Sequence, residues 1–506
     1  MLTTSLYEHA KGRGAAMADD HNFARTISRI REIVDHPIVD ADAHLVEPFP
    51  LILEELREIL GPNAEADFAR SRYHTLYSST AAWPPMSDDQ RRREWAVAPV
   101  WWGTPVNATD RTAAYVPQAF HSRLEQLGID HALVYPSWLG LPRIPEAELR
   151  VACCRAVNRY LARATSEYRD RMTPVAMLPT TTPQEAIDEL EYAVNVLGLK
   201  AIMIDSSVDR VVPKWAHLYD ELGTRVCRWD TYGIDSEYDY DPFWARCASL
   251  GVAVTAHGGS RGTTLFQSVS NFTYNHIEHF AAAGHALARS LVLGGVTRRF
   301  PDLNFACLEG GAAWGVVLLH SLIEHWEVRG LPGLARVDPH NIDAGAVIAQ
   351  LDKMRDPVWK EPALLSLLTE GEGDRMAPAE VDDFAACGAR SSNDIKELFA
   401  PRFWFGCEAD DPGAAWALKP PHRLRAMFGS DIGHFDVPDM LNVLPAAWSL
   451  VEKGQMTEEE FGDYCFRNVV RLHGTMNPAF FDGTTVEGAA CRVLPAGGRP
   501  DDPPIR

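Results

Sequence analysis

Short apolar runs alternate along the chain with longer segments that carry apolar residues at helical spacing. Eight of these runs are four to six residues long, are rich in branched or aromatic side chains, and mostly lack apolar–polar alternation. This pattern is typical of strands that are covered on both faces, because neither face contacts water. We therefore predict eight buried strands, at Ile38–Asp42, Ala132–Pro136, Pro174–Pro179, Ala201–Ile204, Val252–His257, Phe305–Glu309, Phe403–Glu408 and Ala426–Asp431.

The segments between the runs carry helix start and stop signals. Thr182 is a candidate N-cap, Pro183 suits the first helical position, Glu185 completes a capping box, and Gly198 ends the pattern. Comparable signals bound two further helices, at Asp241-Pro242 to Gly251 and at Thr457 with Glu460 to about Gly474. Strands alternating with helices in this number predict a (β/α)8 TIM barrel. A doubly wound sheet is the alternative, and the lack of a GxGxxG motif after the first strand disfavours it.

Two segments are too long to be simple connections between strand and helix. They follow the first strand and the sixth strand, so we expect both at the catalytic end of the barrel, as lids or as oligomer contacts. The first contains Trp83, Trp95, Trp101 and Trp102. These form either an aromatic wall for a large apolar substrate, with Trp102 in contact, or the core of an accessory subdomain. The predicted organisation is a tail and short helix (1–36, helix at 24–35), a barrel (37–487) with insertions 45–127 and 330–400, and a C-terminal arm (488–506).

The overall charge and the cysteines indicate which partners and which cellular compartment to expect. The formal charge of −21 repels phosphate backbones, so we expect no nucleic-acid partner. No run of eighteen apolar residues and no secretory signal is seen, which predicts a cytoplasmic protein without a membrane partner. The nine cysteines are scattered and contain no CxxC pair, as expected of buried reduced thiols.

Polar side chains with ligand chemistry stand at four predicted strand ends. Asp42 and His44 are two residues apart and so face the same side of the first strand. His257 ends the fifth strand, Glu309 the sixth and Asp431 the eighth. Each alone is a weak signal with a hydrogen-bonding or packing alternative. Together, at the C-terminal rim of one barrel, they predict a metal site.

The donor set indicates which metal the site would hold. Two carboxylates and two imidazoles suit zinc, with manganese or iron as alternatives. Cys407 is the thiol nearest a predicted strand end, and one such thiol does not favour a soft metal.

Several stretches resemble the amidohydrolase superfamily, in particular the amidohydrolase-related branch that includes aminocarboxymuconate-semialdehyde decarboxylase and resorcylate-type decarboxylases. The resemblance runs from about Ile38 to Glu487. It is carried by "VDADAHLVEP", "YDPFWARCASLGVAVTAHGG", "LVLGGVTRRFPDLNFACLEGGAAW", "MFGSDIGHFD" and "FRNVVRLHGTMNPAFF". It implies a barrel with one divalent ion and, since similar proteins are often dimers, a homodimer.

The resemblance also implies roles for individual residues. Asp42 and His44 match the ligands of the first strand, His257 that of the fifth, and Asp431 the aspartate of the eighth. The sixth strand departs from the pattern, because many of the decarboxylases carry a histidine where this chain has Glu309. The acid–base step of the decarboxylases therefore does not transfer unchanged.

Three functions remain open at this point. In the first, slightly favoured, the protein is a metal-dependent hydrolase of a small organic substrate: Asp431 orients or deprotonates the attacking water, His257 helps stabilise the oxyanion, and a protonated Glu309 serves the leaving group. The second is non-oxidative decarboxylation of an aromatic or unsaturated acid on the same ion. The third is a binding barrel without catalysis.

Four further residues are candidates around the site. His434 and either His276 or His279 would contact substrate, with helix packing as the alternative for the latter two. Glu47 would orient His44 or begin the long insertion. Arg111 would clamp a substrate carboxylate, with a surface ion pair as its alternative.

Overall fold

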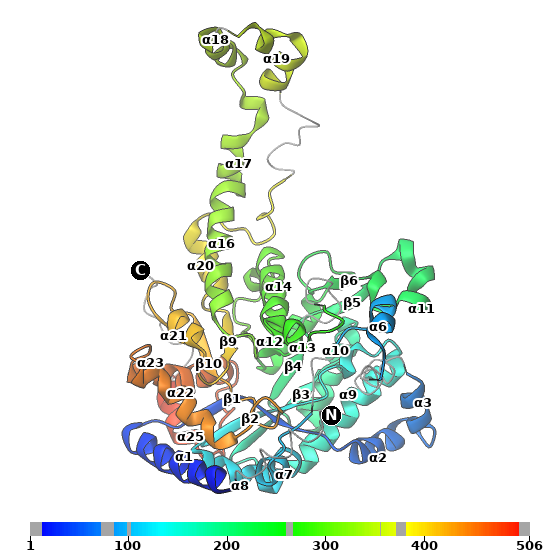
Figure 1. Cartoon of the computed structure of the whole chain (residues 1–506), viewed down its shortest axis with the longest axis vertical. Coiled ribbons are helices and arrows are strands. Elements are labelled where there is room, and N and C mark those ends of the chain that lie inside the picture. Colours follow the sequence, from blue (N-terminus) through cyan, green and yellow to red (C-terminus); the bar gives the residue numbers. More distant parts are fainter. Residues whose placement is uncertain are drawn as a thin grey trace.

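The eight predicted strands form one parallel sheet that curls into a barrel (Figure 1). The structure is a computed structural model and describes residues 13–71, 85–98, 103–259, 267–354, 356–370 and 381–494. The sheet order is β1-β2-β3-β4-β7-β8-β9-β10. The strands are β1 (Val39–Leu45), β2 (His131–Pro136), β3 (Met172–Met177), β4 (Ala201–Ile204), β7 (Val254–Ala256), β8 (Phe305–Cys307), β9 (Phe403–Cys407) and β10 (Arg425–Phe428). The prediction of a (β/α)8 TIM barrel is confirmed.

The barrel is closed where the last strand meets the first. The Asp431 N–H donates to Asp42 O and the His44 N–H donates to Ile432 O, each at 2.9 Å. These bonds tie the segment after β10 to β1. They fix the two segments that carry Asp42, His44 and Asp431 against each other.

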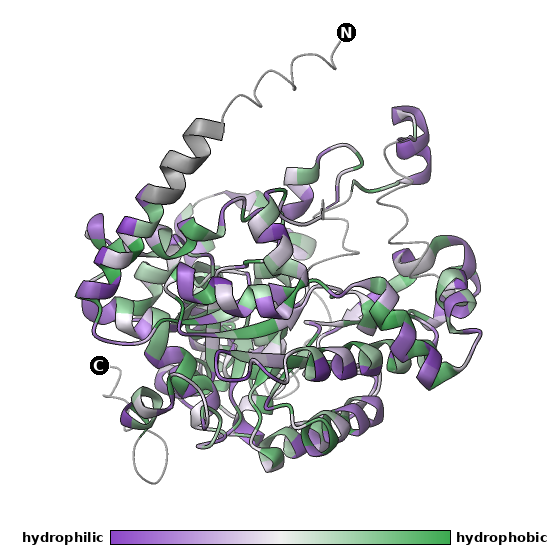
Figure 2. Ribbon diagram, turned by 90° about the horizontal axis from the view of Figure 1, so that it is seen from below, coloured by the Kyte–Doolittle hydropathy of each residue, from purple (hydrophilic) through white to green (hydrophobic). Residues whose placement is uncertain are grey.

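The strands are buried on both faces, which explains why their sequences are apolar without alternation. All seven residues of β1 and all five of β9 are buried. Figure 2 shows apolar residues gathered toward the middle of the molecule and hydrophilic residues on the outer helices. A polar side chain at a strand end is therefore held by a dry, close-packed wall.

The helix boundary signals are confirmed, except that Glu185 forms no capping box because its carboxylate accepts hydrogen bonds from Arg150. In α10 (Pro183–Glu191) the Thr182 hydroxyl accepts the Glu185 N–H at 3.2 Å. Helix α12 (Asp241–Leu250) ends at Gly251 in the left-handed conformation, and Thr457 and Glu460 form a complete capping box before α23 (Glu458–Gly462). After α23 the chain continues through a π-helical turn, η11 (Asp463–Arg467), into α24 (Asn468–Gly474).

The ends of the chain are more helical than the sequence suggested. Helix α1 (Arg13–Ile33) begins eleven residues before the predicted helix at 24–35, so part of the expected tail is helical. Helix α25 (Glu487–Val493) occupies the start of the expected C-terminal arm, and its Ala490 is buried. Residues 1–12 of the tail and 495–506 of the arm lie outside the described residues.

The long insertions carry their own helices, and one hairpin was not predicted. The first insertion contains α2 (Phe49–Leu60), α3 (Ala64–Arg70), α6 (Asp88–Glu94), α7 (Ala108–Tyr115) and α8 (Pro117–Leu127). Between β4 and α12 lies an antiparallel hairpin of β5 (Val208–Val211) and β6 (Cys227–Asp230). Its strands are only four residues long and are rich in charged residues, so no apolar run announces them.

The second insertion projects away from the barrel (Figure 1). Helix α16 (Ala313–Arg329) leaves the barrel and leads to α17 (Leu331–Val337), and at the far end lie α18 (Ala344–Met354) and α19 (Pro362–Thr369). The chain returns to the barrel through α20 (Ser392–Phe399), which packs on α16. Among the described helices, none combines the length and the apolar character that a membrane crossing requires.

Candidate metal centre

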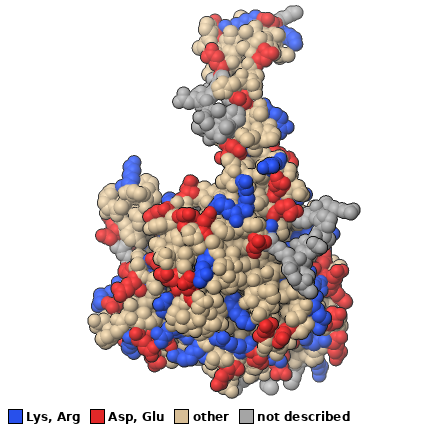
Figure 3. All heavy atoms as spheres, turned by 180° about the vertical axis from the view of Figure 1, so that it is seen from behind, with Lys and Arg blue, Asp and Glu red and all other residues tan. Residues whose placement is uncertain are grey.

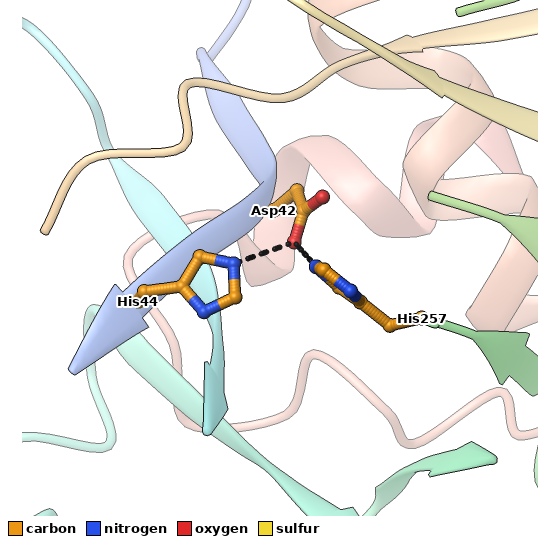
Figure 4. A group of neighbouring side chains, drawn as sticks. All are labelled: Asp42, His44 and His257. Atoms are coloured by element: carbon orange, nitrogen blue, oxygen red, sulfur yellow. Dashed lines mark ion pairs between the residues drawn. The ribbon is translucent and has the colours of Figure 1, made fainter. Parts of the chain in front are cut away.

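Strand β1 places Asp42 and His44 side by side at the rim of the barrel (Figure 4). Both are buried, and His44 Nε2 lies 3.4 Å from Asp42 Oδ1. The two-residue spacing sends both side chains to the same face of the strand, as the sequence predicted.

His257 reaches the same carboxylate from the opposite wall of the barrel (Figure 4). It follows β7 directly, and its N–H donates to Ile204 O at 3.0 Å, so the ladder with β4 extends to this residue. Its Nε2 lies 3.2 Å from Asp42 Oδ1, and its ring is perpendicular to that of His44 with centroids 5.1 Å apart. Asp42 Oδ1 thus stands between two imidazole nitrogens.

Asp431 and His434 complete the cluster from the segment after β10. Asp431 Oδ1 lies 3.3 Å from His44 Nε2 and 2.7 Å from His434 Nδ1. The His434 ring stacks on the His44 ring with centroids 3.9 Å apart. The predicted ligands therefore lie in two overlapping clusters, Asp42 with His44 and His257, and His44 with Asp431 and His434, so His434, predicted to contact substrate, stands among the candidate ligands.

Glu309 lies next to the predicted ligands, on the side of His257. Its Oε2 is 3.5 Å from His257 Nε2, and the side chain is 8% exposed. It stands two residues beyond the end of β8, as expected for the residue at the sixth strand end. This position suits a group that faces both the cluster and a substrate.

The backbone is strained at the two carboxylates that follow strands. Glu309 has φ 57° and Asp431 has φ 51°, in the left-handed region that non-glycine residues seldom adopt. Such strain persists where the surrounding structure holds it, and it clusters at active sites. Gly433 (φ 108°) sits so close to β1 that a Cβ there would lie 2.3 Å from His44 O. The turn after β10 therefore requires glycine.

The buried donor atoms have the separations that a coordinated cation imposes. Metal bonds of 2.0–2.2 Å in tetrahedral geometry place ligand atoms roughly 3.4 Å apart. The three contacts among Asp42, His44, His257 and Asp431 measure 3.2, 3.3 and 3.4 Å. Within the described residues, Asp42 Oδ1, His44 Nε2 and His257 Nε2 have no hydrogen-bond partner. Buried polar atoms are almost always paired, so this donor set fits a divalent metal ion.

The electrostatics of the cluster also favour a cation. Burial, together with Asp436 and Asp42, raises the pKa of Asp431 well above its usual value. Burial, together with Asp431 and Asp42, also raises the pKa of Glu309 well above its usual value. Burial and the neighbouring His434 lower the pKa of His44 to about 3, which keeps its imidazole neutral as a ligand must be. Two buried carboxyl groups with raised pKa values and a neutral His44 imidazole form a site that positive charge stabilises.

Glu47, predicted either to orient His44 or to begin the long insertion, reaches the cluster through a neighbouring residue. Its carboxylate oxygens accept the Ser137 N–H at 3.1 and 3.2 Å. The Ser137 hydroxyl lies 3.3 Å from His434 Nε2. Burial raises the pKa of Glu47 to about 8. Glu47 therefore supports the cluster through Ser137 and His434, because the chain has already turned away from His44 at this position.

The other predicted substrate contacts fall in different places. His276, in α13 (Phe272–His276), lies 3.7 Å from Asp436, in the segment that carries Asp431 and His434, and both side chains are about one-third exposed. Arg111 is exposed on α7 and donates to Thr104 Oγ1 at 2.7 Å and to Pro105 O, so the structure does not bring it into the cluster. Trp102, like Trp83 and Trp101, lies outside the described residues. Trp95 is 41% exposed and donates to Gln267.

A buried ion pair beside His257 was missed in the sequence. Asp205 follows β4 directly and receives two hydrogen bonds from Arg143, which ends the short helix η2 (Leu141–Arg143), at 2.5 and 2.7 Å. The guanidinium also donates to Gly259 O at 3.4 Å. A Cβ on Gly258 would lie 2.2 Å from Asp205 Oδ1. A carboxylate directly after an apolar strand was the signal used for Asp431, and the same signal was present at Asp205.

Tyr135 was also missed, although it lies under the cluster. Its ring is 6.1 Å from that of His44 and 5.4 Å from that of His257, and its hydroxyl donates to Thr255 at 3.1 Å. An aromatic residue within an apolar strand gives no sequence signal beyond packing. Its contribution is visible only once the barrel brings the strands together.

Comparison with known proteins supports the fold and shows the family. The structure of an amidohydrolase from Mycobacterium avium subsp. paratuberculosis K-10 is similar, with a TM-score of 0.51 at 15% identity over 87% of this chain and 100% of that chain. A dihydroxybenzoic acid decarboxylase from Polaromonas sp. JS666, with bound manganese, gives a TM-score of 0.46 at 13% identity, over 87% of this chain and 97% of the other. A comparison with curated proteins gives no significant match. A family model described as amidohydrolase matches residues 143–461, which is more than half of the chain. The chain therefore belongs to the amidohydrolase family.

Proposed function

We propose that the protein is a divalent-metal-dependent hydrolase that acts on a carbonyl-type carbon of a small organic substrate. The observation that carries the proposal is a pair of buried, overlapping clusters: donor atoms of Asp42, His44 and His257 lie within 4.8 Å of one another, and so do those of His44, Asp431 and His434. Within the described residues, Asp42 Oδ1, His44 Nε2 and His257 Nε2 have no hydrogen-bond partner. A bound divalent ion supplies Lewis acidity and lowers the pKa of water toward ~7. Two carboxylates and two imidazoles favour zinc, with manganese or iron as alternatives.

The surrounding residues divide the proton transfers between them. A bound cation would lower the pKa of Asp431 from the raised value that burial gives it, so its carboxylate would accept a proton from the attacking water. His434 Nδ1, 2.7 Å from Asp431 Oδ1, holds that carboxylate in place. His257 serves as a ligand and helps to stabilise the oxyanion. Glu309 faces the same space, and burial raises its pKa, which favours the protonated form that would donate a proton to the leaving group.

Decarboxylation is the second candidate, and the state of Glu309 favours it too. A carboxylic acid kept protonated by burial beside the site is able to protonate a ring carbon as CO2 leaves. The substrate would then be an aromatic or unsaturated acid. A binding barrel without catalysis is the third candidate, and the strained backbone at Glu309 and Asp431 argues against it.

The experiment that tests the proposal follows isotopes into the product. The full chain, loaded with zinc, manganese or iron in turn, is incubated in ¹⁸O-water and, separately, in deuterium oxide with panels of esters, amides, lactones and aromatic acids. Incorporation of ¹⁸O into a product acid supports hydrolysis. Release of CO2, with deuterium in a new C–H bond and no ¹⁸O in the organic product, supports decarboxylation in place of hydrolysis. Less than a tenth of an equivalent of any transition metal, after purification without chelator, would remove both.

We also propose a location and an assembly for the protein. All nine cysteines are free, as expected in a reducing compartment, which supports a cytoplasmic location. A homodimer is the proposed assembly, with neither nucleic acid nor membrane as a partner.

A further inference from the structure

The projecting part of the second insertion exposes an unusual amount of apolar surface. We call residues 331–354 and 356–370 the arm; Figure 1 shows it extending from the barrel beyond α16, and Figure 3 shows its narrow connection to the body. None of the residues of α18, of α19 or of the short helix η8 (Pro357–Lys360) is buried. Its exposed large apolar side chains are Leu331, Val337, Ile342, Ile348, Met354, Val358, Trp359, Leu367 and Leu368.

The arm does not contain enough buried surface to hold itself in place. Helices α18 and α19 contact each other, but Val347, Leu351, Leu364 and Leu365 are only half-buried. A segment of this size does not form a hydrophobic core alone. The ion pair of Lys360 with Asp352 is exposed and adds little stability.

We propose that the arm is a self-association element, whose apolar face packs against a second copy of this chain. Nine large side chains between 37% and 68% exposed lie along it. At roughly 90 Å² each they present about 800 Å², which is what one partner contributes to a standard protein interface. Trp359, 44% exposed, is the type of residue that anchors such an interface.

Charge distinguishes a second copy from a lipid surface. Helix α19 contains no charged residue, so two copies approach there without like-charge repulsion. A helix that binds an anionic membrane has a basic face, whereas α18 carries a single basic residue, Lys353. A pairing of two identical arms is closed and needs no other protein.

The base of the arm offers a place for a side chain of the partner copy. A hollow of about 410 Å³ lies between α16 and α17 and is lined by Trp326, Glu327, Pro332, Gly333 and Arg336. The Arg336 guanidinium donates to Glu327 O at 2.9 Å, which holds one side of the hollow. Apolar anchors in such hollows contribute a large share of binding energy.

The test is sedimentation velocity of the full chain at micromolar concentration. The arm variant is M354E/L367E, which places charge on side chains 68% and 50% exposed. The matched control is V106E/V196E, which adds the same charge at side chains 91% and 65% exposed outside the arm. We expect dimers for the wild type and the control, and at least about 100-fold weaker association for the arm variant, because charges in an interface core lose hydration without a partner.

A monomeric wild type, or an arm variant that still dimerises as tightly as the control, overturns the proposal. A monomeric wild type that co-sediments with phosphatidylglycerol vesicles through the arm overturns it in favour of a membrane contact. Hydrogen exchange gives a readout independent of any variant. The amides of α18 and α19 are expected to be protected in concentrated wild-type protein and to lose protection on dilution, while the barrel amides stay protected at both concentrations. Unchanged exchange on dilution through the dissociation range contradicts the proposal.

Discussion

The mouth of the barrel, the rim where Asp42, His44 and His257 lie, differs from the arm in how it departs from the usual burial of side chains. At the mouth, Asp42, His44 and His257 place charged or polar atoms in a dry interior. In the arm, Met354 and Leu367 place large apolar side chains in water. Proteins rarely keep either arrangement without a compensating contact, since buried polar groups cost free energy and exposed apolar patches favour association.

The difference lies in what each region needs from outside the chain. The mouth is rigid: three backbone segments are locked by main-chain hydrogen bonds, and its separations already match those around a cation. The arm is held by few contacts of its own, and its face is broad and without specific geometry. A small, preorganised polar site suits an ion, whereas a broad apolar face suits a second protein surface.

The largest expected effect follows from the removal of one side chain at the mouth. His257→Ala takes away a donor atom that contacts both Asp42 and Glu309, and leaves the strands intact. Loss of a residue that only hydrogen-bonds to a metal ligand typically lowers metal affinity about 10–100-fold. We expect a larger loss here, with metal content below a tenth of an equivalent and no turnover. Elemental analysis with circular dichroism measures this, and His276→Ala, one-third exposed, is the control. Wild-type metal content in the His257 variant would remove that residue from the ligand set.

Glu309→Gln separates chemistry from metal binding at the same mouth. The amide keeps the shape of the side chain and cannot donate an acidic proton. We expect full metal content and a loss of turnover of about 10²–10⁴-fold, the usual contribution of a general acid. The measurement is kcat for whichever reaction the isotope experiment identifies. Unchanged kcat would leave Glu309 a structural role only.

Much of the barrel and its mouth was predictable from the sequence, because both rest on local signals. All eight strands were located, and Asp42, His44, His257 and Asp431 lie in two clusters that share His44, near where their positions at strand ends implied. A polar residue that ends an apolar run is visible in one dimension. Closure of a parallel barrel then brings such residues to the same rim.

The remaining features depend on contacts between distant segments. Arg143 gives no sign in the sequence that it reaches Asp205, and Glu47 contacts Ser137 only because the ends of β1 and β2 lie together. The β5–β6 hairpin lacks an apolar run, and the arm was recognised only as a long insertion. Which insertion residues stay exposed is a tertiary property, so the apolar face of the arm could not be read from composition.

Asp205→Asn tests whether the mouth is held rigid by the ion pair next to it. The Asp205 carboxylate raises the pKa of the Arg143 guanidinium further above its usual value, and this substitution leaves that charge buried and poorly paired. We expect a loss of about 3–5 kcal/mol in the free energy of unfolding, as for other broken buried pairs. Urea unfolding measures it, with the exposed Asp188→Asn as control. A change within 0.5 kcal/mol, the range of ordinary surface substitutions, would show that the pair does not stabilise the mouth.

The smallest expected effect decides whether mouth and arm act independently. If the arm pairs two copies, a tenfold dilution removes about 1.4 kcal/mol of stabilisation and lowers Tm by about 1–3 °C. M354E/L367E should show no such dependence on concentration, because it has no dimer to dissociate. Chelation should lower Tm by the same amount in the wild type and in this variant, since separated sites without shared contacts contribute additively. Differential scanning calorimetry of both proteins, at two concentrations with and without chelator, measures all four shifts. If chelation lowers Tm by different amounts in the two proteins, the arm and the metal site are energetically coupled. The connecting element would be α16, the helix that begins four residues after Glu309.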